Sequence, residues 1–157
     1  MSGNSRNSSG AGAPAGPVGL DPRGPRFAAV LTTVVFVVVL LTGSAWLALA
    51  QAVIFAIGAF DPRRTPYGLL YRYLVAPRLA PPTEREDPAP VRFAQSVGLV
   101  FTLVAVAGYL SGATVLGIVF AAFALVAAFL NGFFGLCLGC EAYLLIRRLR
   151  GAGSPAA

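Results

Sequence analysis

The stretch FAAVLTTVVFVVVLLTGSAWLALAQAVIFAIGAF, from Phe27 to Phe60, contains no charged side chain over 34 residues. A second stretch, from Phe93 to Cys140, is uncharged over 48 residues. The whole chain has 157 residues, of which 57% are hydrophobic and only 11% are charged. A water-soluble domain of this size could not leave so much apolar surface exposed. The sequence therefore predicts an all-α integral membrane protein, because helices satisfy their backbone hydrogen bonds inside the bilayer.

Each uncharged stretch is too long for one transmembrane helix and long enough for two, since about 20 apolar residues cross the hydrocarbon layer. We therefore expect each stretch to fold into a helical hairpin. Gly and Ser favour turns, which places the turns at Thr42–Ser44 and at Ser111–Ala113. The predicted architecture is a four-helix bundle. Its four spans are residues 27–41, 45–60, 93–110 and 114–131.

The hairpins are predicted to form a single four-span membrane domain, residues 20–150, with a cytoplasmic linker at residues 61–92. Residues 1–19 are mainly Ser, Gly, Ala, Pro and Asn, and we expect a disordered cytoplasmic tail. Residues 151–157 are expected to be a second disordered tail. One face of the linker predicts a short helix at the level of the lipid headgroups. That face consists of Tyr67, Leu70, Tyr71 and Leu74.

The basic residues predict the orientation in the membrane. All twelve are arginines, and they lie before the first hairpin, between the hairpins and after the second. Neither hairpin turn contains a charge. Under the positive-inside rule, the N-terminus, the linker and the C-terminus are cytoplasmic. The Arg-only, Ala- and Val-rich composition is typical of a GC-rich bacterial genome, so we expect a multi-pass protein of the bacterial inner membrane.

The net charge of +6 indicates anionic lipid headgroups as partners. Nucleic acid is not expected, because the arginines are spread along three membrane edges without a stacking motif. The predicted spans contain no carboxylate, Lys, Arg or His, which argues against a proton-coupled transporter or an ion pump. Hydrolytic catalysis has no candidate residues either, since the chain lacks His and paired carboxylates near the membrane. Among the few polar residues in or near the spans are Gln51 and Asn131.

Both cysteines lie in the segment GLCLGCE, from Gly135 to Glu141, as Cys137 and Cys140. The C-x-x-C spacing is typical of redox and metal motifs. We expect a cytoplasmic-side helix at residues 133–150 that carries this motif and either prolongs the last span or bends along the membrane surface. Its glycines are predicted to share one side, where another helix or a partner protein can approach. These are Gly132, Gly135 and Gly139.

Three interpretations of Cys137 and Cys140 stay open. The pair could be a redox-active or sulfur-carrying dithiol, whose pKa a helix N-terminus lowers and the neighbouring Glu141 raises. It could bind a soft metal such as zinc or copper only if two copies of the chain share the ion, because the chain has no His and one Met. Otherwise both cysteines are small hydrophobic packing residues. No cofactor is predicted.

Three segments carry a likeness to a known family: DPRGPRF at Asp21–Phe27, RFAQ at Arg92–Gln95 and GFFGLCLGCEAY at Gly132–Tyr143. Together they resemble the bacterial integral membrane family called domain of unknown function 4395, over about residues 18 to 149. The cysteine segment, which in that family commonly reads G-F-C-x-G-C-E-x-Y, is the most specific part. Here Leu136 stands where the family often has Phe or Tyr. The resemblance implies a small four-span protein and an association with thiol or sulfur metabolism, with no established activity.

The functional hypothesis is a membrane-anchored thiol site. In it, Cys137 and Cys140 exchange electrons or sulfane sulfur with a soluble cytoplasmic thiol protein or sulfurtransferase through a mixed disulfide. The alternatives are a non-enzymatic membrane scaffold or assembly subunit with structural cysteines, and a shared metal site in a homo-oligomer. Whether the protein is an enzyme stays open.

Overall fold

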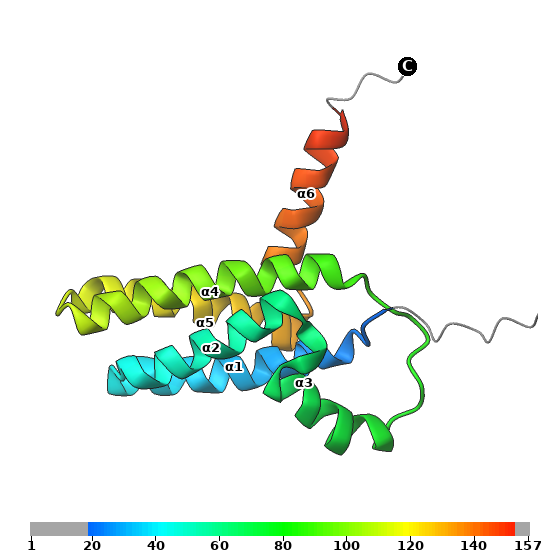
Figure 1. The fold of residues 1–157 in the computed structure, drawn as a ribbon, viewed down its shortest axis with the longest axis horizontal. Helices are drawn as coiled ribbons and strands as arrows, with labels where there is room; N and C mark the ends of the chain where they lie inside the picture. Colours follow the sequence, from blue (N-terminus) through cyan, green and yellow to red (C-terminus); the bar gives the residue numbers. More distant parts are fainter. Residues whose placement is uncertain (1–18, 153–157) are drawn as a thin grey trace, which may run out of the picture.

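The computed structural model describes residues 19–152, and within this range the chain is helical and contains no strand. Four long helices lie side by side in a bundle, and a fifth projects away from it (Figure 1). The bundle helices are α1 Arg23–Thr42, α2 Ala45–Phe60, α4 Pro88–Leu110 and α5 Thr114–Phe134. The projecting helix is α6, Leu138–Ala152.

The predicted disordered tails fall largely outside the described residues, which begin at Gly19 and end at Ala152. Of these tails, the structure describes only Gly19, Gly151 and Ala152. At the first boundary, the backbone of the buried Leu20 forms two hydrogen bonds of 2.9 Å with the backbone of Glu86 in the linker. At the second, Gly151 and Ala152 are the last residues of α6. The helix α6 therefore continues two residues past the predicted end of the domain at residue 150.

Three helices, α1, α4 and α5, are long and apolar enough to cross a membrane, with 20, 23 and 21 residues. The apolar helix α2 has 16 residues and is shorter. At about 1.5 Å per residue, a helix of that length covers less than the usual 30 Å of hydrocarbon. These helices indicate a membrane protein.

The helices of the first and third predicted spans begin before those spans, which start at Phe27 and Phe93. α1 begins at Arg23 and α4 at Pro88. Proline suits the first turn of a helix because its missing N–H would have no partner there. The carboxylate of Asp87 also caps α4 by accepting a hydrogen bond of 2.9 Å from the Ala89 N–H. Charge marks where apolar sequence ends, whereas these local capping signals determine where a helix begins.

The two predicted turns are confirmed, between α1 and α2 and between α4 and α5. Gly43 ends α1 with a φ of 64°, a left-handed conformation that glycine adopts without strain. The next residue, Ser44, starts α2, and its side chain accepts a hydrogen bond of 3.3 Å from the Leu47 N–H. This two-residue connection makes α1 and α2 antiparallel neighbours.

The hairpins interlock, because α1 packs mainly against α5 and α2 mainly against α4, while α4 also packs against α5. A continuous buried core joins all four helices near the turns. Its fully buried members are Phe36, Val39, Ala48, Ala105 and Ala121.

The linker is helical over a longer range than predicted. After the short η1 helix, Pro62–Arg64, come α3, Pro66–Leu70, a π-helical turn, Tyr71–Val75, and a 3₁₀ turn, Ala76–Arg78. The first two tyrosines of the linker, Tyr67 and Tyr71, form hydrogen bonds with other parts of the domain. The Tyr67 hydroxyl donates to Gln51 Oε1 over 2.8 Å, and the Tyr71 hydroxyl donates to the Asp21 carboxylate over 2.8 Å.

The predicted helix at residues 133–150 is interrupted, since α5 ends at Phe134 and α6 starts at Leu138. From this break, α6 runs transversely to the long axis of the bundle (Figure 1). The expected common glycine edge is wrong for the same reason. Gly132 of α5 lies against Val30 of α1, whereas Gly139 of α6 lies against Ala94 of α4.

Candidate functional site

The interruption between α5 and α6 is formed by Gly135, which has a φ of 68°. Its N–H donates to the Asn131 carbonyl over 3.1 Å, and the Leu136 N–H donates to the Leu130 carbonyl over 3.1 Å. Glycine is favoured at such a left-handed position because a Cβ would be strained. The turn that follows places the cysteine motif at the start of α6.

Cys137 occupies the capping position of α6. Its carbonyl accepts a hydrogen bond of 2.9 Å from the Glu141 N–H, which is the first hydrogen bond of the helix. Its Sγ accepts a hydrogen bond from the Cys140 N–H at 3.4 Å. A helix N-terminus presents free N–H groups and a partial positive charge, so it stabilises a thiolate at this position.

The two thiols face each other, with Cys140 Sγ 2.7 Å from Cys137 Sγ. Both cysteines are free and half-buried. The i, i+3 spacing of Cys137 and Cys140 brings the two side chains onto the same side of the first turn. The pair is therefore in position to form and break a disulfide with little movement of the backbone.

The pKa values of the two thiols move in opposite directions. The hydrogen bond from the Cys140 thiol lowers the pKa of Cys137 from an ordinary value of 9.0 to about 7. The Cys140 and Gly139 N–H groups add to this effect, whereas burial and the charge of Glu86 oppose it. The pKa of Cys140 is raised, first by its hydrogen bond to Cys137 and then by burial. Near neutral pH, Cys137 is therefore partly ionised to the thiolate, whereas Cys140 keeps its proton.

Two carboxylates act on this pair. Glu141, which the sequence singles out, is exposed in the first turn of α6, and its charge raises the pKa of Cys140. Glu86 raises the pKa of both thiols, and sequence analysis missed it. It lies in the linker, more than fifty residues before the cysteines, so spacing along the chain gave no signal.

The motif is held against α4 by its own glycine. A Cβ on Gly139 would lie 2.6 Å from both Cα and Cβ of Ala94, so the two helices approach as closely as their backbones allow. One turn further along α6, the rings of Tyr143 and Phe93 pack with their centroids 5.7 Å apart. Together, the two contacts between α6 and α4 fix the position of the thiols relative to the bundle.

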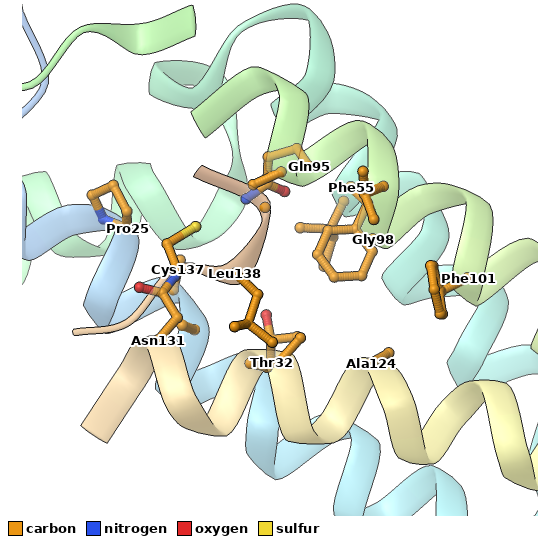
Figure 2. Close-up of a pocket in the computed structure, with 18 of the residues that line it drawn as sticks. Pro25, Thr32, Phe55, Gln95, Gly98, Phe101, Ala124, Asn131, Cys137 and Leu138 are labelled. Carbon is orange, nitrogen blue, oxygen red and sulfur yellow. The ribbon is translucent and has the colours of Figure 1, made fainter. Parts of the chain in front are cut away.

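Cys137 lines a cavity of about 360 Å³ between the four bundle helices (Figure 2). Figure 2 shows Cys137 and Asn131 at one end of the cavity and Phe101 and Ala124 at the other. The walls are mostly apolar, with a few polar side chains. These are Thr32, Gln51, Thr65, Tyr67, Gln95 and Asn131.

The polar residues Gln51 and Asn131, which stand out in the apolar sequence, both belong to this cavity. Gln51 is 1% exposed, and its Nε2 donates to Thr32 Oγ1 over 3.4 Å. Its carbonyl oxygen accepts the hydrogen bond from Tyr67, whose pKa is raised by burial. The sequence marked these residues as unusual, but it did not indicate that they share one chamber with Cys137.

No group of three or more His, Cys, Asp or Glu side chains that could hold a metal ion is found among residues 19–152. The pair supplies two thiolate ligands, and a closed tetrahedral zinc site needs four. The arrangement therefore provides a dithiol in which the pKa of Cys137 is lowered, beside a mostly apolar cavity.

Comparison with known proteins gives one match. The sequence model of the family described as Domain of unknown function (DUF4395) matches residues 20–148. This range contains all four bundle helices, the linker and the cysteine motif. Nothing matches the chain among the curated proteins or among the solved structures.

Proposed function

Because the chain belongs to the family Domain of unknown function (DUF4395), whose description states no activity, we propose a function from the geometry of its site. The protein is a membrane-anchored thiol oxidoreductase. Its Cys137–Cys140 pair exchanges electrons with a soluble cytoplasmic thiol protein. The observation that carries this proposal is the pair of thiols 2.7 Å apart at the start of α6, with the pKa of Cys137 lowered to about 7.

The membrane arrangement that we propose has four spans. The helices α1, α4 and α5 have the length for this role, and α2 is the shorter fourth span. Since α1 and α2 are joined by a two-residue turn, a crossing by α1 requires α2 to return toward the linker. The linker then leads to α4, which starts at the same end of the bundle as α1 (Figure 1). A short span is accommodated by local thinning of the bilayer at modest cost.

Arginine placement supports a cytoplasmic location for the linker, the thiol pair and both termini. The described arginines lie near the inner ends of the long helices, in the linker or on α6, and the two tight turns carry none. The positive-inside rule therefore places the turns on the outer side of a bacterial inner membrane. On α6, the exposed Leu145, Ile146 and Leu149 share one side at helical spacing. A helix that carries this side and three arginines is suited to lying along the headgroup layer.

The asymmetry between the two thiols gives the exchange a direction. A stabilised thiolate is a good leaving group, and it favours the reduced form of the pair over the disulfide. The Cys137–Cys140 disulfide is therefore expected to act as an oxidant toward a partner dithiol. The raised pKa of Cys140 means that this sulfur takes up a proton as soon as it is released.

In the proposed reaction, a partner thiolate attacks Sγ of Cys137 in the disulfide form. A bond forms between the partner sulfur and Cys137, the bond between the two cysteines breaks, and Cys140 leaves and takes up a proton. The second partner thiolate then attacks the partner sulfur in this mixed disulfide, and Cys137 leaves as the thiolate. The partner is oxidised to a disulfide, and the pair is reduced.

The test uses the purified full-length protein in detergent and a water-soluble aromatic disulfide that releases a coloured thiolate. The reduced wild type is expected to release two equivalents of thiolate, because Cys140 displaces the reagent first bound to Cys137. The Cys140→Ala variant should release one equivalent and keep a stable adduct on Cys137, detected by mass spectrometry. At pH 7 the Cys137→Ala variant should react at least about tenfold more slowly than the wild type, since the low-pKa thiol is gone.

The scaffold and packing alternatives predict other results. If neither thiol reacts in the folded protein, the cysteines are packing residues and the exchange is wrong. If the wild type keeps one adduct and releases one equivalent, Cys140 does not resolve the mixed disulfide, and the two-cysteine mechanism is wrong.

A further inference from the structure

Repeated turnover of the proposed exchange requires an oxidant, since each partner dithiol leaves the Cys137–Cys140 pair reduced. The oxidant and the soluble partner react with the same cysteine pair, so they must approach it from different sides or at different times. The cavity of about 360 Å³ that Cys137 lines offers such a site. Its volume lies within the range of pockets that hold small organic ligands, about 300–1,000 Å³.

The walls of this cavity favour a flat, apolar ligand. Four phenylalanine rings and several alanines line it. Aromatic rings stack on planar ligands and contribute large apolar contact areas. The cavity also lies between the helices that we propose to cross the membrane, so its surroundings supply lipid-soluble compounds. The four rings belong to Phe55, Phe93, Phe101 and Phe123.

The cavity also offers hydrogen bonds that the protein does not use. The side-chain amides of Gln95 and Asn131 line it, and neither forms a hydrogen bond within residues 19–152. Both side chains are half-buried, and their amide groups are free to bond a ligand. Figure 2 shows Asn131 beside Cys137 and Gln95 further along the cavity, on the side opposite Thr32. A ligand with carbonyl oxygens on a flat ring would satisfy these donors.

We propose that this cavity binds a lipid-soluble quinone, which re-oxidises the Cys137–Cys140 dithiol. The proposal rests on the thiol-exchange function above and names its electron acceptor. A quinone is planar and dissolves in the hydrocarbon layer, it presents carbonyl oxygens, and it accepts two electrons, which is the number that a dithiol releases.

In this step, Cys137 reacts as the thiolate and Cys140 as the thiol. A sulfur–sulfur bond forms between the two cysteines, and the two electrons that they lose reduce the quinone. The Cys140 proton and one proton from water convert the two carbonyl oxygens of the quinone into the hydroxyls of a hydroquinone. The products are the disulfide, ready for the next partner, and a hydroquinone that returns to the lipid.

The experiment mixes the reduced full-length protein, in phosphatidylcholine liposomes without oxygen, with a decyl-chain benzoquinone. All other ring positions of this quinone are substituted, so that a thiol cannot add permanently to the ring. We expect one hydroquinone per chain, followed by its ultraviolet absorbance, together with the loss of both thiols. A Cys137→Ala, Cys140→Ala double variant should show only the background rate.

Two matched variants on α5 locate the reaction. Ala128 lines the cavity and Ala122 does not. For each variant we measure the quinone rate divided by the rate with the soluble aromatic disulfide, a ratio that is insensitive to the amount of folded protein. Ala128→Phe should lower this ratio at least about tenfold by occupying the pocket, whereas Ala122→Phe should leave it within about twofold. In the unmodified protein, a decyl naphthalene without redox activity should compete with the quinone.

The outcomes separate this inference from the proposed function. If the wild type reacts with the soluble disulfide and never reduces the quinone, the quinone proposal is wrong and the exchange stands. Equal ratios for the two α5 variants, or no competition by the naphthalene, would show that the cavity is not the quinone site. A wild type that fails with the soluble disulfide contradicts the exchange itself.

Discussion

The outer half of the bundle, next to the two tight turns, and the inner half, next to the linker and α6, are built from the same four helices and differ in packing. In the outer half, five core residues have exposed fractions of 0% and belong to one cluster. The inner half contains a partly open cavity of about 360 Å³. The five outer residues are Phe36, Val39, Ala48, Ala105 and Ala121.

This difference shows that the inner half is packed less densely than the outer half, at the position of the cavity. Protein interiors are normally close-packed, and an empty volume costs stability because its lining loses contacts. Here the empty volume coincides with the polar side chains of Thr32, Gln51, Gln95 and Asn131 and with the activated Cys137. Hydrogen-bonding groups line this cavity, and a reactive thiol lies at its end. Ligand binding explains such a cavity better than a packing defect does.

The largest expected effect tests the packing difference with two phenylalanines whose rings stack at 6.3 Å, Phe36 and Phe55. Phe36 is fully buried, whereas Phe55 lines the cavity. Phe36→Ala should lower the free energy of unfolding by about 3–5 kcal/mol, and Phe55→Ala by about half as much, because one side of its ring already faces open volume. The measurement is unfolding by SDS in mixed micelles, followed by circular dichroism. Equal losses for the two variants would mean that both halves are packed alike.

Much of the outer half could be predicted from the sequence. The two uncharged stretches and their Gly and Ser residues predicted the hairpins, and the turns lie where they were expected, at Gly43 and Gly112. Helix starts were less predictable, because α4 begins at a capping Asp87 and Pro88, before the uncharged stretch. The interlocked pairing of α1 with α5 and of α2 with α4 was not predictable, since apolar helices in a bilayer carry little sequence signal for their neighbours.

A smaller effect is expected where the inner half is tightly packed, at the contact between α6 and α4. Gly139→Ala would place a Cβ 2.6 Å from Cα and Cβ of Ala94, so α6 has to shift, at a cost of about 1–3 kcal/mol in the same unfolding assay. The matched control is Gly151→Ala in the same helix, where no atom lies within 4 Å of the added Cβ. This control should be neutral or slightly stabilising, because alanine is the better helix former. If both variants behave alike, the contact does not hold the motif in place.

The sequence predicted which residues form the cysteine site, but it did not predict how they are arranged. The spacing of Cys137 and Cys140 pointed to paired thiols, and the helix N-terminus that this interpretation needed is present, because Gly135 ends α5 just before the motif. The sequence predicted a helix over residues 133–150 that either prolongs the last span or bends along the surface, and it did not locate the break, since nothing in local composition distinguishes Gly135 from Gly132 or Gly139. The influence of Glu86 on both thiols depends on how the linker folds back, which no local pattern reports.

The smallest expected effect concerns the electrostatics of the inner half, measured as the rate of alkylation of Cys137 by an uncharged reagent between pH 5 and 9. The thiolate is the reactive form, so the rate should rise with pH and level off above the pKa of about 7. Cys140→Ala removes the strongest stabilising hydrogen bond, which should move the midpoint to higher pH. Glu86→Gln removes a negative charge that opposes the thiolate and should move the midpoint slightly to lower pH.

The matched control is Glu84→Gln, two residues earlier in the same linker, at a carboxylate that does not act on either thiol. It should leave the midpoint unchanged, so that a shift in Glu86→Gln alone reports the fold of the linker over the motif. A midpoint near 9 in the wild type, the ordinary value for a thiol, would mean that the start of α6 and the Cys140 thiol do not activate Cys137. The inner half would then differ from the outer half in packing alone, and the cavity would have no reactive group at its end.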